Sequence, residues 1–143
     1  MLINRIPMVA FQTAVYNLLT TYQTTPVYDD VGDTNTASVT YPCVSFGTYH
    51  CEPGGAKDVV IFDVTLAVEI WSNYEGKKEI NEIADDIAAV YTSYAIDLSD
   101  SGFVAIAQSI DSLEAFPEEV QGYHGTLTLA AKIQYIGNTG TGG

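Results

Sequence analysis

Positive charge is scarce in this chain. Its 143 residues include 5 Lys and Arg against 18 Asp and Glu, which leaves a formal net charge of −13. Sequence-independent binding to nucleic acid depends on cations that displace counterions from phosphates. The composition therefore excludes a protein that grips DNA or RNA. It is compatible with an acidic wall that lets a duplex slide past, and also with an acidic surface that keeps a protein soluble, which is the commoner reason for such a charge.

Cysteine and long apolar runs are also scarce. The two cysteines, Cys43 and Cys51, lie eight positions apart in a β-rich segment, where a disulfide would need a reversal of the chain between them. We therefore expect reduced thiols, in keeping with an intracellular site of assembly. No apolar run approaches the length of a membrane span, and the N-terminus does not read as a secretory signal. We expect no membrane partner.

Residues for catalysis or metal binding are few. Cys43 or Cys51 could pair with His50 or His124 as nucleophile and base. On a strand, however, the adjacent His50 and Cys51 point to opposite faces. Cys43 and Cys51 are an even number of positions apart, so both thiols are expected on the same face. No Cys-x-x-Cys or His-x-x-x-His spacing occurs. We predict no catalytic, cofactor-binding or metal-binding residue and no cofactor; a Cys/His-dependent enzyme is kept as an alternative.

Hydrophobic periodicity is what the chain does have. It predicts a helix over residues 3–22 with Pro7 in its first turn, a short strand at 27–28, an exposed acidic loop over 29–40 and a strand over 43–51. The apolar stripe expected for this helix consists of Ile6, Val9, Ala10, Phe11, Ala14, Val15, Leu18, Leu19 and Tyr22.

Residues 60–72 form the clearest predicted strand. The even-numbered residues from Val60 to Ile70 are all apolar, whereas the odd-numbered face mixes Asp63 and Glu69 with apolar residues. A strand of this length spans roughly 40 Å, so we expect it to project past its own core.

The second half of the chain predicts a helix and two strands. Ser72-x-x-Glu75 has the form of a capping box, which predicts a helix from there to about residue 94. Strands are expected at 103–113 and 123–136, with a loop over 114–122 between them. The fold class is α+β: one domain over 1–136, a mostly antiparallel sheet of four to five strands, and two amphipathic helices on one face. Residues 137–143 are expected to be a flexible Gly/Thr tail.

The face of the sheet left uncovered is the expected contact surface. Trp71 beside Glu69 is the best candidate, and the alternative is that Trp71 packs under a loop of its own chain. The complete set of candidate interface residues comprises Trp71, Glu69, Asp29, Asp30, Asp33 and Tyr135.

An ordered set of short motifs runs along most of the chain. They are Val27-Tyr28-Asp29, Tyr41-Pro42-Cys43-Val44-Ser45-Phe46-Gly47, Ile70-Trp71-Ser72, Asn73-Tyr74-Glu75-Gly76 and the segment from His124 to Leu129. In this order and spacing, the chain resembles the tail-completion, or tail-to-head joining, proteins of long, flexible-tailed phages, a group similar to tail terminators. The acidic loop over 29–40 is not matched to that pattern.

The resemblance implies a structural virion protein of the tail or neck that is not an enzyme. Copies of the chain, assembled in the host cytoplasm, would form a ring, expected to be a hexamer. The ring would contact the tail tube protein on one side and a head-completion or connector protein on the other. DNA would pass through the lumen without specific binding. A small acidic binding or adaptor module is the alternative from a different class.

Overall fold

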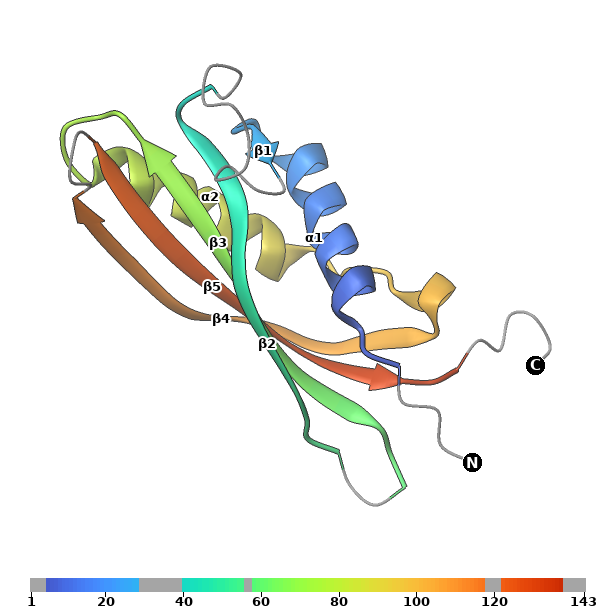
Figure 1. Cartoon of the computed structure of the whole chain (residues 1–143). Helices are drawn as coiled ribbons and strands as arrows, with labels where there is room; N and C mark the ends of the chain where they lie inside the picture. Colours follow the sequence, from blue (N-terminus) through green and yellow to red (C-terminus); the bar gives the residue numbers. More distant parts are fainter. Residues whose placement is uncertain (1–4, 29–39, 56–57, 118–121, 138–143) are drawn as a thin grey trace.

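Five strands, two α-helices and one 3-10 helix build the part of the chain that the computed structural model describes, residues 5–28, 40–55, 58–117 and 122–137. In chain order the elements are α1 (Met8–Tyr22), β1 (Val27–Tyr28), β2 (Cys43–Pro53), β3 (Ile61–Ser72), α2 (Lys78–Ser93), η2 (Ser99–Ser101), β4 (Phe103–Pro117) and β5 (Tyr123–Tyr135). Figure 1 shows the strongly twisted sheet and the hairpin of β2 and β3, whose tip extends past both helices. The predicted α+β class is confirmed.

The strands form a single sheet in the order β1-β2-β3-β5-β4. Three of the neighbouring pairs are antiparallel, and β1 runs parallel to β2 through Val27 opposite Val44 and Tyr28 opposite Ser45. The sheet is therefore mostly antiparallel, as predicted, and β4 forms one of its edges.

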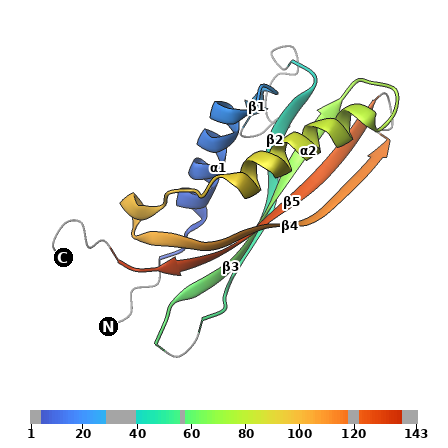
Figure 2. The same ribbon diagram turned by 180° about the vertical axis from the view of Figure 1, so that it is seen from behind.

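The alternation in β3 decides which face of the sheet is covered. Phe62, Val64, Leu66, Val68 and Ile70 are all buried. They belong to one hydrophobic core with the inward residues of β5 and of both helices, so the two helices cover the same face. Figure 2 shows α2 lying along the strands on this side.

Tyr91 connects the layers of the core. Its side chain is fully buried, and its hydroxyl donates a 2.6 Å hydrogen bond to the carbonyl oxygen of Ala130 in β5. Its ring meets Phe11 of α1 edge-on, with ring centroids 6.5 Å apart. One side chain of α2 thus contacts both the sheet and the other helix.

Gln108 of β4 completes the C-terminal end of α2. Its amide nitrogen donates to the carbonyl oxygens of Tyr91 and Tyr94, at 2.7 and 3.0 Å, and its amide oxygen accepts from Ile96 N–H at 2.9 Å. The last carbonyls of a helix have no partner within the helix, so this glutamine satisfies groups that would otherwise lose hydrogen bonds on burial.

The predicted capping box at Ser72 is wrong. Helix α2 begins at Lys78, after a turn in which Gly76 has φ +124°, a conformation that ends any helix started at Ser72. The Ser72 hydroxyl is buried and instead accepts from Tyr74 N–H at 3.0 Å and donates to the Glu79 carboxylate at 2.6 Å. Ser72 therefore fixes the turn and attaches it to the first turn of the helix.

Ser72→Ala is expected to lower the free energy of unfolding by about 1–2 kcal/mol, because it removes both hydrogen bonds from a buried position. Urea unfolding followed by circular dichroism measures this change. Thr92→Ala is the matched control, since its hydroxyl bonds only to the Ala88 carbonyl on an exposed helix surface. Equal losses in the two variants would contradict the role given to Ser72.

Helix α1 begins at Met8, later than predicted, and Pro7 precedes its first turn. Ile6 and Val9 were expected in the buried stripe but are 67% and 81% exposed. Val9 lies two residues before buried Phe11, which at 100° per residue places it on the opposite side of the helix. Neither helix in the described ranges is long and apolar enough to cross a membrane.

Strand β4 is longer than predicted. Glu114 to Pro117, expected in a loop, pair with β5 from Thr126 to Tyr123. Pairing with a neighbouring strand overrides the weak local β preference of this segment. Apart from Thr40 and Gly137, the acidic loop over 29–40 and the tail over 137–143 lie outside the described residues.

Candidate interface on the open sheet face

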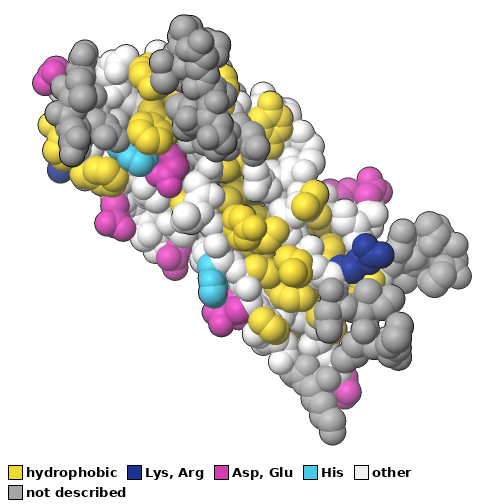
Figure 3. Space-filling view, viewed as in Figure 1, with side chains coloured by type: hydrophobic (Ala, Val, Ile, Leu, Met, Phe, Trp, Pro, Cys, Tyr) yellow, Lys and Arg dark blue, Asp and Glu magenta, His cyan; other side chains and the backbone are white. Residues whose placement is uncertain are grey.

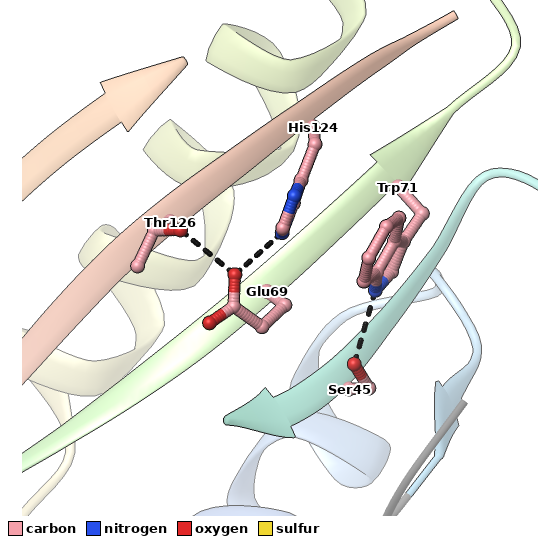
Figure 4. A network of polar contacts seen from close by, with 5 residues as sticks. All are labelled: Ser45, Glu69, Trp71, His124 and Thr126. Atoms are coloured by element: carbon pink, nitrogen blue, oxygen red, sulfur yellow. Dashed lines mark hydrogen bonds and ion pairs between the residues drawn. The ribbon is translucent and has the colours of Figure 1, made fainter. Parts of the chain in front are cut away.

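The face of the sheet opposite the helices carries polar and aromatic side chains from neighbouring strands. Register places Ser45 of β2 opposite Glu69 of β3, and Glu69 opposite Thr126 of β5. Two residues further along, Trp71 is opposite His124. Side chains two apart on a strand share a face, so these five side chains lie together on the open face (Figure 4).

Glu69 is the acceptor at the centre of this group. It accepts a 2.5 Å hydrogen bond from His124 Nε2 and a 2.7 Å bond from Thr126 Oγ1 (Figure 4). The Glu69 and His124 side chains are only 18% and 14% exposed. Burial by itself raises the pKa of Glu69, but the hydrogen bonds from His124 and Thr126, with the charge of His124, outweigh it and hold that pKa below its ordinary value.

The lowered pKa of Glu69 predicts a pH-dependent stability. Because this pKa is lower in the folded than in the unfolded chain, the contribution of Glu69 is present above its ordinary pKa of 4.5 and is lost as pH falls through the folded value. The difference in unfolding free energy between the wild type and Glu69→Gln should therefore be largest above pH 4.5 and shrink in more acidic solution. Urea unfolding at a series of acidic pH values measures it, with Glu82→Gln, on the exposed face of α2, as control. A difference that is independent of pH would contradict the assignment.

Trp71 begins a row of rings that crosses three strands. Its indole Nε1 donates to Ser45 Oγ at 3.0 Å, and the indole stacks on the His124 ring with centroids 3.9 Å apart and planes at 13°. Phe116 of β4 packs against the same imidazole at 4.9 Å and remains 43% exposed. We call Trp71, His124 and Phe116 the aromatic row.

Gly47 makes room for the Glu69 carboxylate. A Cβ atom at this position would overlap Glu69 Oε2. The bonds from His124 and Thr126 are made to the other oxygen, Oε1, so a side chain at position 47 would press on the carboxylate that these bonds hold. The absence of a side chain at position 47 is therefore part of what holds the network in place.

Of the predicted interface residues, the structure brings Trp71 and Glu69 together. Tyr135 lies on the helix-covered face, half-buried, with its ring 5.1 Å from that of Phe103. Asp29, Asp30 and Asp33 lie outside the described residues. From the sequence, His124 was considered as a possible base or metal ligand and as part of a family motif, but not as an interface residue. Ser45, Thr126 and Phe116 were missed as members of the group.

The two thiols do not resemble catalytic nucleophiles. Both cysteines are free, and the extra residue of β2 between Phe46 and Tyr49 reverses the side-chain alternation. Cys43 and Cys51 therefore lie on opposite faces of the sheet. The prediction that they share a face is wrong. Burial raises the pKa of Cys43 to about 11 and also raises that of Cys51. Little thiolate is present at neutral pH under those conditions.

The histidines do not complete a catalytic pair with either thiol. Cys43 is opposite Trp71, and His124 lies one strand further across the sheet. His50 is exposed and lies 3.4 Å from the equally exposed carboxylate of Glu52. Within the described ranges, no group of three or more His, Cys, Asp or Glu side chains could hold a metal ion. What the open face offers is a fixed polar and aromatic surface, of the kind found at protein contacts.

Comparison with known proteins finds a matching family model and a solved structure with a similar fold. The family model described as tail completion protein gp17 matches residues 12–134. Among solved structures, a chain of the virion of a native gene transfer agent (GTA) particle superposes with a TM-score of 0.76 at 18% identity, covering 89% of this chain and 96% of that one. At this identity the likeness shows a shared fold. No curated protein sequence matches.

Proposed function

Since this chain belongs to the tail completion protein gp17 family, we propose that it closes the phage tail as a ring of copies and joins it to the head. It is a structural protein of the virion, placed in the tail or neck. The ring is proposed to be a hexamer that contacts the tail tube protein on one side and a head-completion or connector protein on the other. DNA passes through its lumen.

The aromatic row is the single observation that carries a contact role for the open face. Trp71, His124 and Phe116 form a continuous ring surface. Hydrogen bonds fix two of the three rings: Trp71 donates to Ser45, and His124 donates to Glu69, which Thr126 holds in turn. Side chains already fixed before association lose less conformational entropy on binding. We assign this surface to contact with a neighbouring subunit of the tail or neck.

The net negative charge of the chain supports the proposal that the ring surrounds a channel for DNA. With a net charge of −13, the wall of a ring repels the phosphates of a passing duplex. A wall of this kind does not bind the DNA. DNA can therefore move through the tail without being held there.

Complementation tests the proposed function. Inactivating the gene for this chain in the phage that encodes it should leave heads and tails unjoined, and adding the purified chain to that lysate should restore joined particles. Heads and tails that join equally well without the chain would contradict the proposal.

A further inference from the structure

The outer edge of β2 is open for most of its length. Among the described residues, β1 pairs with Val44 and Ser45 alone, and residues 47–53 have no neighbour on that side. Unpaired main-chain groups along a strand edge can accept another strand. The short pairing with β1 shows that this edge already receives a strand within the chain.

An apolar groove lies directly beside this edge. It has a volume of about 590 Å³ and is formed by α1, β1 and β2, with Val9, Tyr16, Phe46 and Tyr49 in its lining. Val9 is 81% exposed and Tyr49 is 59% exposed. Figure 3 shows hydrophobic side chains gathered over this part of the molecule. A free strand edge beside an apolar groove is the geometry by which sheets add an extended segment.

The groove is also free of the charge that dominates the rest of the molecule. Helix α1 contains no Asp, Glu, Lys, Arg or His from Met8 to Tyr22, although the chain carries 18 acidic residues. Two copies with a net charge of −13 repel each other. They approach at lower cost along the uncharged groove than along acidic surfaces. On the open edge of β2 beside it, the one acidic side chain among residues 47–53 is Glu52, which lies 3.4 Å from His50.

The other edge of the sheet matches these properties. Strand β4 has no neighbour on its outer side among the described residues. Its first part, residues 103–110, is uncharged, is of similar length to the open part of β2, and exposes Val104 and Ile106. The acidic residues of β4, Asp111 and Glu114, lie beyond that part. A ring needs two different surfaces that meet head to tail, whereas one edge pairing with itself closes a dimer.

We propose that the uncharged first part of β4 in one copy adds to the open edge of β2 in the next copy, beside the groove lined by Val9, Tyr16 and Tyr49. The inference rests on the proposed ring and names the surfaces that close it. Each copy contributes one edge to each of two neighbours, so ring closure pairs the open part of β2 and the first part of β4 in every copy.

Two charge-introducing variants test this contact, one on each surface. Tyr49→Lys places a charge beside the groove, and Ile106→Asp places one on the β4 edge. Each is expected to weaken association of the purified chain about tenfold or more, because a charge buried without a partner costs at least the 1.4 kcal/mol that a factor of ten represents. Association is measured by light scattering and native mass spectrometry over a series of protein concentrations. If the free chain is monomeric, the number of copies bound to each isolated tail is measured instead. Tyr74→Lys, a matched change of an exposed tyrosine in the turn before α2, should leave association unchanged.

A mixture distinguishes this contact from other arrangements. Tyr49→Lys retains an intact β4 edge and Ile106→Asp retains an intact groove, so a 1:1 mixture should form pairs that neither variant forms alone. Wild-type-like association of both variants, or a mixture that gains no pairs, would overturn the contact while leaving the proposed function intact. A wild-type chain that neither self-associates nor binds tails would overturn the proposed function, and the contact with it.

Discussion

Replacing Trp71 by alanine is expected to reduce the yield of joined particles by about 30-fold to 100-fold, because buried aromatic residues at the centre of a contact contribute about 2–3 kcal/mol to binding. The indole is the first ring of the aromatic row and is held by Ser45 and His124. Its loss removes both the contact surface and the ring that orients His124. The complementation reaction with purified variants measures the yield.

Two further variants make this result specific to the open face. Phe116→Asp changes the exposed end of the aromatic row without removing any hydrogen bond of the network, and should also lower the yield. Tyr74→Ala removes an exposed ring that belongs to the turn before α2 and should leave the yield unchanged. Unfolding curves establish that each variant is folded. Normal joining by both folded Trp71→Ala and folded Phe116→Asp would exclude the open face as the contact surface.

Replacing Tyr91 by alanine is expected to lower the free energy of unfolding by about 3–5 kcal/mol, the usual cost of emptying a large buried aromatic site. The change removes the edge-on contact with Phe11 and the hydrogen bond to the Ala130 carbonyl, so it detaches α2 from both α1 and β5. Domains of this size are stable by about 5–15 kcal/mol. The loss is thus a large fraction of the total stability, and a domain at the lower end of that range would be left close to unfolding.

Tyr91→Phe separates the two parts of this effect. It keeps the ring and removes the hydroxyl, so a loss of about 1–2 kcal/mol is expected. Urea unfolding of the three proteins measures both steps. A Tyr91→Ala variant that is no less stable than Tyr91→Phe would contradict the role of the ring in joining the layers.

Patterns with a fixed period made part of the fold predictable. The apolar even-numbered residues of β3 identified the buried face, and the stripe through Phe11, Val15 and Leu19 identified the inner side of α1. These patterns are local, because a side chain's face follows from its own position in a strand or helix. They were sufficient for the α+β class and for the two helices on one face.

Features that depend on register between strands were not predictable. The sequence placed Trp71 and Glu69 on one face, but their contacts with His124 and Thr126 follow from an alignment of β3 and β5 that no local pattern encodes. The reversed position of Cys51 follows from one extra residue in β2. Gln108 was missed for the same reason, since its partners at the end of α2 lie 12 to 17 positions away in the chain.

Electron microscopy of isolated tails mixed with the purified chain tests the central claim most directly. Tails from a phage that lacks the chain should have open ends, and the added chain should appear as a ring that closes one end of each tail. Tail ends that stay open while the chain remains in solution would contradict a tail-completion role.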